Sequence, residues 1–418
     1  MNHFFLSLLS SVLAVVAISN DCLSQSAIAV DRSFSSKKIN EAGDIEGALY
    51  ADRTRRIRLT ASPKGSGEKI EVASSKAKDL YYFEKEHNIV WIKFKAIKTS
   101  GLAFTIVPDS TKDDYDFLLF KAEGRSTISK IQKKELRPIR SNIARTRNIN
   151  FGYTGLRINE KHTHNTSGIN AGFSQTIDVK DGEIYFLAID NVYDNGGGAT
   201  IEFMYFEEQT IEGTVVDSDN KPVEAEIVWE SKNYGAELSR AQSNPSDGMF
   251  KITVPYDKDG TDEYTLSIFS EGCLFEEVTY TPVEIEAKSS APLKVILPKL
   301  KKGEKANLKC INFVSNKPVF LKSAYPSLKR LVKLMKRNKD LKVLIVGHTN
   351  GCAGGMEFNQ ELSEARAAET RDYLIGKGIN ERRITTDGKN CKEMLYPIDS
   401  GPRLQALNRR IEVHVTSY

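Results

Sequence analysis

The chain has 418 residues, of which 40% are apolar and 27% charged, with a formal net charge of +4. This composition is typical of a globular protein of about three domains and excludes a disordered or fibrous chain. The weak positive charge argues against nucleic-acid binding, which needs a concentrated basic face.

An apolar run, broken only by serines, extends over residues 4–18. Its length suits the core of a secretory signal peptide and is short for a membrane-spanning helix, which needs about 20 apolar residues. Small residues precede two cleavage positions, after Ser24 or after Ala29, and the first predicts a signal peptide over residues 1–24. We therefore expect an exported protein, in which cysteines can form disulfides.

Short runs of β-branched and aromatic residues, separated by turn residues, fill residues 30–206. The clearest runs are 89–94, 102–107, 117–120, 184–189 and 200–205. They predict an all-β sandwich. A membrane β-barrel is the alternative, but charged residues such as Lys93 and Lys95 interrupt the long apolar faces that barrel strands need.

Five short motifs in this region resemble a jelly-roll module of secreted and surface proteins of the Bacteroidota. They lie at residues 88–91, 113–117, 140–145, 154–156 and 190–191. The resemblance implies a binding or scaffolding module and no enzyme activity.

The same region contains acidic residues at the ends of predicted strands. Asp114 and Asp116 precede or begin one buried run, and Asp190 follows another. Carboxylate oxygens suit Ca²⁺, so these residues are candidate metal ligands and Ca²⁺ is the one candidate cofactor. The alternative is that they only form turns.

Residues 209–298 contain a second set of strands, predicted at 211–217, 225–229, 249–255 and 264–268. Their turns and glycines resemble the carboxypeptidase regulatory-like domain, a small β-sandwich. The resemblance implies a spacer or an interaction unit without protease chemistry. A charged segment with Pro and Gly, residues 297–305, then predicts a short linker.

Residues 306–418 alternate between strands and helices. Strands are predicted at 308–313, 341–347, 383–385 and 410–415, and helices at 323–338 and 362–377. The predicted fold is therefore multidomain, with two all-β sandwiches followed by an α/β (α+β) domain.

Three motifs of this last region match the OmpA-like C-terminal domain, a peptidoglycan-binding module. They are residues 347–350, 359–367 and 408–413. The residues themselves support a binding site, because Thr349 and Asn350 follow a buried strand at the edge where open α/β sheets bind ligands. We also expect Ser363 and Glu364 in the first turn of a helix, whose free N–H groups favour an anion.

A guanidinium pairs bidentately with a carboxylate, so Arg366 is the candidate anion-binding residue. A solvated arginine on the helix surface is the alternative. The resemblance implies that the ligand is the diaminopimelate of the peptidoglycan stem peptide, with its carboxylate on Arg366 and its ammonium at the loop. The matching positions are Thr349, Asn350, Asn359, Leu362 and Arg366, with support from Arg409 or Arg410.

Two further features bear on this site. Asn350 stands where the family normally has aspartate, so it keeps a hydrogen-bond acceptor but lacks the negative charge. Cys352 and Cys391 both follow predicted strands of the domain and border one crevice, which makes a disulfide between them plausible. Two free thiols are the alternative.

The sequence has no phosphate-binding loop, zinc-protease motif or nucleophile elbow. We therefore expect a non-enzymatic protein of the periplasm, associated with outer membrane and cell wall. Its partners would be peptidoglycan and an outer-membrane or surface protein. The alternative function is a secreted or surface adhesin with a weakened OmpA-like domain.

Overall fold

The computed structural model describes residues 31–74, 76, 79–144, 152–166, 172–194, 196–232, 236–288, 292–308, 310–350 and 355–418. The predicted signal peptide and Cys352 lie outside these residues. Within the described part of the chain, no helix is long and apolar enough to cross a membrane.

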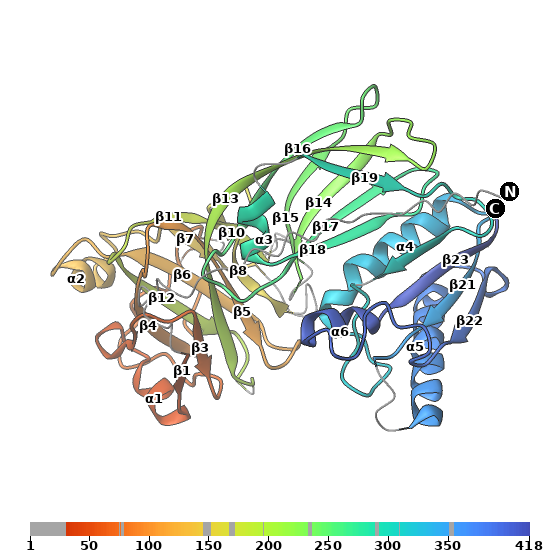
Figure 1. Cartoon of the computed structure of the whole chain (residues 1–418). Coiled ribbons are helices and arrows are strands. Elements are labelled where there is room, and N and C mark those ends of the chain that lie inside the picture. The colour runs from red at the N-terminus through yellow and green to blue at the C-terminus, as the bar shows by residue number, and fades with distance from the viewer. Residues whose placement is uncertain are drawn as a thin grey trace, which may run out of the picture.

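Two β-sheets contain the strands of the N-terminal part, residues 31–206, and one of them extends into the middle part, residues 209–298 (Figure 1). One is a six-stranded sheet in the order β2-β4-β12-β6-β7-β9. Its strands are β2 (Leu49–Ala51), β4 (Ile89–Lys95), β6 (Tyr115–Lys121), β7 (Arg140–Asn142), β9 (His164–Asn165) and β12 (Ile184–Asn191). The other is a nine-stranded sheet that follows β1-β3-β13-β5-β8-β10, with β11 on β5, and with β16 and β19 on β13.

The strands of the nine-stranded sheet are spread over residues 32–297 of the sequence. They are β1 (Arg32–Phe34), β3 (Arg56–Leu59), β5 (Ser100–Pro108), β8 (Thr154–Arg157), β10 (Phe173–Gln175), β11 (Ile177–Val179), β13 (Ala199–Asp217), β16 (Met249–Tyr256) and β19 (Leu293–Leu297). Short helices α1 (Ser36–Glu41) and α2 (Thr127–Gln132) and the 3-10 helix η1 (Ile45–Gly47) connect the N-terminal strands.

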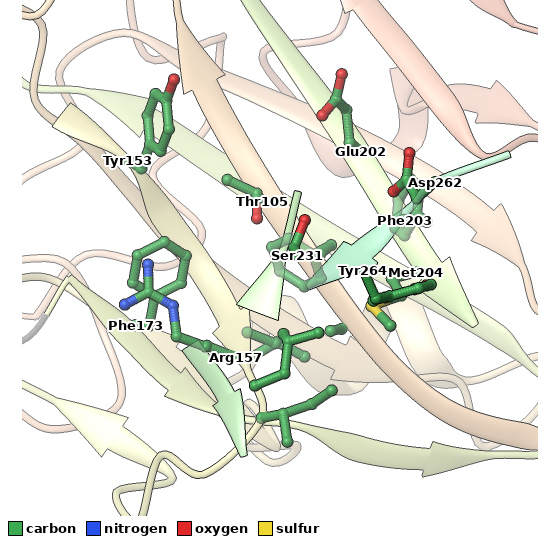
Figure 2. Close-up of a pocket in the computed structure, with 15 residues that line it drawn as sticks. Thr105, Tyr153, Arg157, Phe173, Glu202, Phe203, Met204, Ser231, Asp262 and Tyr264 are labelled. Atoms are coloured by element: carbon green, nitrogen blue, oxygen red, sulfur yellow. The ribbon is translucent and has the colours of Figure 1, made fainter. Parts of the chain in front are cut away.

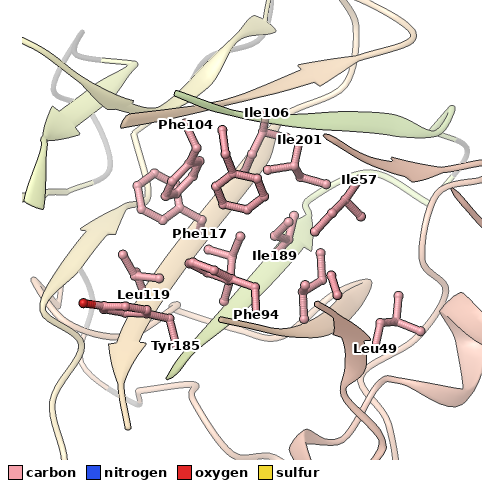
Figure 3. Close-up of a cluster of buried hydrophobic side chains, with 14 of the residues drawn as sticks. Leu49, Ile57, Phe94, Phe104, Ile106, Phe117, Leu119, Tyr185, Ile189 and Ile201 are labelled. Atoms are coloured by element: carbon pink, nitrogen blue, oxygen red, sulfur yellow. The ribbon is translucent and has the colours of Figure 1, made fainter. Parts of the chain in front are cut away.

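One hydrophobic cluster takes side chains from both N-terminal sheets (Figure 3). Phe94, Phe117 and Tyr185 come from the six-stranded sheet, and Phe104 and Ile201 come from the nine-stranded sheet. The β-branched and aromatic runs predicted as strands at 89–94, 102–107, 117–120 and 184–189 are confirmed as β4, β5, β6 and β12.

Strand β13 joins the N-terminal part to the middle part. Its first half, residues 199–206, pairs with β3 and β5. Its second half pairs with β16 and β19. The sequence predicted separate strands at 200–205 and 211–217 with a boundary between them, but the backbone continues without a break. The polar residues between the two runs gave no apolar alternation, yet their backbone groups pair all the same.

The middle part adds a four-stranded sheet, β15-β14-β17-β18. Its strands are β14 (Ala225–Ser231), β15 (Ala236–Gln242), β17 (Tyr264–Ser270) and β18 (Glu276–Tyr280), followed by helix α3 (Pro282–Lys288). Trp229 and Tyr264 stack in its core with ring centroids 5.4 Å apart. This core also contains side chains of β13, β16 and β19.

The C-terminal domain contains a four-stranded sheet, β20-β23-β21-β22, with helices packed on it. The strands are β20 (Lys305–Leu308), β21 (Lys342–Gly347), β22 (Ile384–Gly388) and β23 (Ile411–Ser417). The helices are α4 (Tyr325–Arg337), α5 (Met356–Gly376) and α6 (Pro402–Asn408), with 3-10 turns η3 (Lys322–Ala324) and η4 (Glu381–Arg383).

Two predicted elements of this domain differ from the observed ones. The strand predicted at 308–313 lies earlier, as β20, and the helix predicted from residue 362 begins six residues earlier, at Met356. Gly355, with φ of 96°, directly precedes this helix. Helix α6 was not predicted, although Pro402 at its first position is a helix-start signal.

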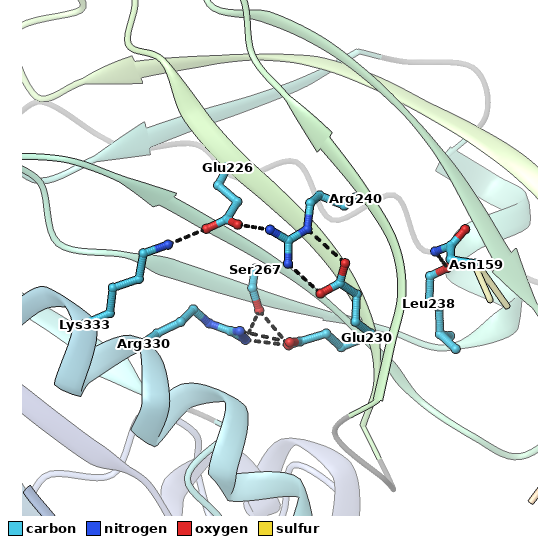
Figure 4. Close-up of polar contacts among 9 residues, drawn as sticks. Asn159, Glu226, Glu230, Leu238, Arg240, Ser267, Arg330 and Lys333 are labelled. Carbon is cyan, nitrogen blue, oxygen red and sulfur yellow. Dashed lines mark hydrogen bonds and ion pairs between the residues drawn. The ribbon is translucent and has the colours of Figure 1, made fainter. Parts of the chain in front are cut away.

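The middle part and the C-terminal domain are packed together rather than separated by a free linker. Leu300 of the predicted linker is buried in one cluster with Phe269, Phe275 and Leu331 of α4. Arg330 of α4 bonds to Glu230 across the junction (Figure 4). The C-terminal site is therefore presented by a domain held against the β-sheets.

Candidate functional site

The site is built where helix α5 packs closely on the ends of β21 and β22. A Cβ atom on Gly347 would lie 2.1 Å from the Ser363 carbonyl oxygen, and one on Gly388 would lie 2.5 Å from Ser363 Oγ. Only glycine permits this approach. The buried face of α5 then carries Asn359, Leu362, Ser363 and Arg366, at helical spacing.

The position of Ser363 corrects one expectation. Because α5 begins at Met356, Ser363 and Glu364 lie about two turns inside the helix. Their backbone N–H groups are not the free groups of a helix start, so the predicted anion site at that helix end is wrong. Instead, Ser363 Oγ accepts a hydrogen bond from the backbone N–H of Asn390 at 3.1 Å.

Thr349 lies in the loop that follows β21 and is 3% exposed. Its backbone N–H donates to the carbonyl oxygen of Asn390 at 2.8 Å. Its Oγ1 is buried and has no hydrogen-bond partner among the described residues. A buried hydroxyl without a partner is costly, so this group is available to a ligand or a water molecule.

Asn350 is held by two carboxamides from the end of the domain. Its Oδ1 accepts from Asn408 Nδ2 at 2.9 Å, and its Nδ2 donates to Gln405 Oε1 at 3.3 Å. Both partners belong to helix α6. The 408–413 motif pointed to Asn408, whereas nothing in the sequence argument identified Gln405.

Arg366 is 4% exposed and points its guanidinium at the turn before α4. It donates to the carbonyl oxygens of Lys317 and Val314, both at 3.4 Å, and lies 5.0 Å from the centroid of the Phe313 ring. Among the described residues it has no ion pair. Burial lowers the pKa of Arg366 to about 10, and the nearby charge of Arg409 adds to this.

Asn359 and Leu362 lie on the same face of α5 as Arg366, one to two turns before it. Asn359 is 5% exposed, and its Nδ2 donates to the Gly355 carbonyl oxygen at 2.7 Å. Leu362 is 9% exposed. Asn359 therefore fixes the first turn of the helix, while Leu362 supplies apolar surface beside it.

Arg410 has a different environment from Arg366. Its Nε lies 2.8 Å from Glu412 Oε1, and both residues are buried. Burial alone would raise the pKa of Glu412, but His348, His414 and Arg410 hold it far below its usual value. Arg410 is thus neutralised inside the domain, at the base of the loop that carries Thr349.

The predicted disulfide is only partly described. Cys391 is disulfide-bonded, and Cys273 and Cys310 are free and buried. Cys352 lies outside the described residues, so its pairing with Cys391 stays a prediction.

The candidate calcium ligands gather at one end of the six-stranded sheet. Asp116 and Asp190 are direct partners across β6 and β12. Asp190 Oδ1 accepts from the backbone N–H groups of His87 and Asn88 at 2.9 and 2.7 Å. Burial, followed by the charges of Asp114, Asp190 and Glu84, raises the pKa of Asp116 well above its usual value. In the part of the chain that the structure describes, no group of three or more acidic, histidine or cysteine side chains is arranged to hold a metal ion.

A cavity of about 90 Å³ lies between the nine-stranded sheet and the four-stranded sheet of the middle part, and Figure 2 shows the side chains that line it. Its lining includes Met204 and Leu238, and the buried atoms Glu202 Oε2 and Ser231 Oγ have no hydrogen-bond partner among the described residues. It is smaller than the roughly 150 Å³ cavities that admit benzene.

Comparison with known proteins gives matches to the C-terminal part of the chain. Residues 312–397 match the model of the OmpA family. The chain is 42% identical over 79 residues to outer membrane protein A of Bordetella avium, over 18% of this chain and 39% of that protein. It is 28% identical over 106 residues to outer membrane porin F of Pseudomonas aeruginosa, over 25% of this chain and 30% of that protein. The chain thus spans well under half the length of these curated relatives.

Solved structures give matches in the same range of coverage. The cell wall anchor of the T6SS from Pseudomonas aeruginosa matches at 28% identity and a TM-score of 0.23, over 25% of this chain and 75% of that chain. The OmpA-like domain of FopA1 from Francisella tularensis matches at 18% identity and a TM-score of 0.23, over 38% of this chain and 76% of that chain. The family match and the curated relatives establish an OmpA-like C-terminal domain.

Proposed function

We propose that this chain is a non-enzymatic protein of the cell envelope that binds peptidoglycan through residues 306–418. The observation that carries the proposal is Arg366, a buried guanidinium without a carboxylate partner among the described residues. Burying a charge without an opposite charge costs several kcal/mol. A ligand carboxylate would offset that cost through a bidentate, charge-assisted contact.

The OmpA-like match supports a stem peptide of peptidoglycan as the source of that carboxylate. In this proposal Thr349 contributes its unpartnered hydroxyl, Asn350 its carboxamide, and Leu362 an apolar wall. Asn359 fixes the helix start. Arg410 supports the loop through its carbonyl oxygen, which accepts from the backbone N–H of His348. Its guanidinium already pairs with Glu412.

We further propose that the β-sheets scaffold a partner from the outer membrane or the cell surface, while the C-terminal domain anchors the chain to the wall. Two β-sandwiches, jelly-roll-like and carboxypeptidase regulatory-like, remain the architecture we propose for them. The shared strand β13 and the packed junction at α4 support a rigid arm between partner and wall. The curated relatives named as outer membrane proteins support a periplasmic location next to that membrane.

Co-sedimentation with purified sacculi tests the wall anchor. The full chain should sediment with diaminopimelate-containing sacculi, and excess soluble meso-diaminopimelate should release it. A chain that stays in the supernatant at every sacculus concentration would favour the adhesin function instead.

A further inference from the structure

The side chains that form hydrogen bonds with Asn350 are neutral amides. Asn350 bonds to Asn408 and Gln405. On the other side of the loop, Asn390 donates to Gln360 Oε1 at 3.1 Å, and Gln360 donates to the Gly388 carbonyl oxygen at 2.8 Å. Carboxamides offer both donors and acceptors but no charge. These side chains can therefore form hydrogen bonds with the N–H and C=O groups of an amide in a ligand.

Arg409 and Arg366 bring positive charge to this end of the domain. Asn408, which bonds to Asn350, directly precedes Arg409, and the charge of Arg409 reaches Arg366. Neither arginine has an ion pair among the described residues. The carboxylates of Glu364 and Glu412 already have partners, since Glu364 accepts a hydrogen bond from Gln360 at 2.6 Å and Glu412 accepts one from Arg410. A ligand ammonium placed at Asn350 would meet neutral acceptors and two guanidinium groups of its own sign.

These two observations lead to one ligand class. We infer that the site selects a carboxylate whose neighbouring nitrogen is acylated, so that a neutral amide rather than an ammonium faces Asn350. This inference rests on the proposed peptidoglycan binding and names the part of the stem peptide that is recognised. Such a group forms wherever the amine of a stem peptide has been joined to another stem through an amide bond. The carboxylate lies on Arg366, and the amide N–H and C=O lie against the carboxamides.

Two soluble competitors that differ only in this group test the inference. The full chain is bound to sacculi and displaced with meso-diaminopimelate or with its N,N′-diacetyl derivative. For the wild type, the diacetyl compound should displace the chain at about tenfold lower concentration, the effect expected from avoiding one unfavourable charge contact. In Asn350→Asp the new carboxylate should reverse the order and favour the free diamine.

Asn380→Asp is the matched control. It adds the same charge to the same domain at an exposed position where the side-chain oxygen caps η4, a role that aspartate also fills. It should leave the order of the two competitors unchanged. The melting temperatures of both variants show that each is folded.

The outcomes separate this inference from the proposed function. Sacculus binding with equal or better displacement by free diaminopimelate would overturn the inference and leave the wall anchor in place. An unchanged order in Asn350→Asp would overturn it as well. Absence of sacculus binding in the folded wild type would overturn the proposed function and the inference together.

Discussion

Two largely buried arginines on neighbouring helices of the C-terminal domain differ in their partners. Arg330 of α4 faces the middle part, where Glu230 accepts two of its hydrogen bonds and Glu277 lies 3.6 Å away. Arg366 of α5 faces the candidate site, where its contacts with the described residues are two carbonyl oxygens, at 3.4 Å, and one aromatic ring.

From this difference in partners we infer different roles for Arg330 at the junction and Arg366 at the candidate site. At the junction the charge of Arg330 is neutralised within the chain, so the pair holds two folded parts together. At the candidate site the charge of Arg366 has no such partner among the described residues, so the fold carries a cost that the proposed ligand carboxylate would offset. Removing Arg330 should therefore damage stability, whereas removing Arg366 should damage binding.

The largest effect is expected from Arg330→Ala. It leaves Glu230 and Glu277, both nearly inaccessible, without their cation, which should lower the free energy of unfolding by about 3–5 kcal/mol. Chemical denaturation measures this. Lys329→Ala removes the same charge from an exposed position of the same helix and should have little effect. Equal stability of the two variants would contradict the assigned role of Arg330.

The junction should also respond to pH. Burial raises the pKa of Glu230 to about 7, with Arg330 opposing this and Glu277 adding to it. The pKa of Glu230 is higher in the folded state than in the unfolded chain, so the protonated carboxyl stabilises the folded state. This contribution to the free energy of unfolding is complete below about pH 4.5 and is lost as the pH rises through about 7. The loss is on the order of 3 kcal/mol. Glu230→Gln should flatten this slope in denaturation curves from pH 5 to 8, and an unchanged slope would assign it to other groups.

The disulfide of Cys391 tests how far the site loop depends on a covalent link. If its partner is Cys352, the bond closes a loop of about 40 residues and contributes about 2–4 kcal/mol. Reduction should lower the melting temperature of the C-terminal domain, and peptide mapping without reductant should recover both cysteines in one species. Recovery of Cys352 as a free thiol would contradict the pairing.

At one end of the six-stranded sheet, Asp116 and Asp190 are direct neighbours across two strands. Like charges meet there, whereas at Arg366 a single charge lacks a partner among the described residues. If calcium binds there, a concentration of a hundred times its Kd would add about 2.7 kcal/mol to the free energy of unfolding and raise the melting temperature. Asp116→Asn should abolish this gain. Asp181→Asn, at an exposed turn, is the control. A melting temperature equal in calcium and in chelator would exclude the site and leave a proton on Asp116, whose pKa is raised, to relieve the repulsion.

Local patterns were sufficient to predict much of the fold. The buried strands β4, β5, β6 and β12 and the helix α4 follow from apolar spacing and residue type. The continuity of β13 did not, because its central residues, 207–210, pair through the backbone and carry polar side chains. The start of α5 was also missed, since its first turn, from Met356, lacks an apolar stripe.

The charges around the candidate site residues do not follow from the sequence motifs. The motif spacing indicated Thr349, Asn350 and Arg366. Whether an arginine has a carboxylate partner depends on the tertiary positions of acids far away in the sequence. For this reason Arg410 was grouped with the ligand-binding residues, although Glu412 neutralises it. Gln405 was missed because a single polar residue in a short helix carries no local signal.

The most direct test of the account is the affinity of the full chain for sacculi in Arg366→Ala, with Arg371→Ala as the control. Arg371 lies on the same helix and pairs with Asp372 at the surface. We expect Arg366→Ala to bind roughly ten- to a hundredfold more weakly, the loss expected for a charge-assisted hydrogen bond of about 1.5–3 kcal/mol, and Arg371→Ala to bind normally. Equal affinities of the two folded variants would contradict this expectation.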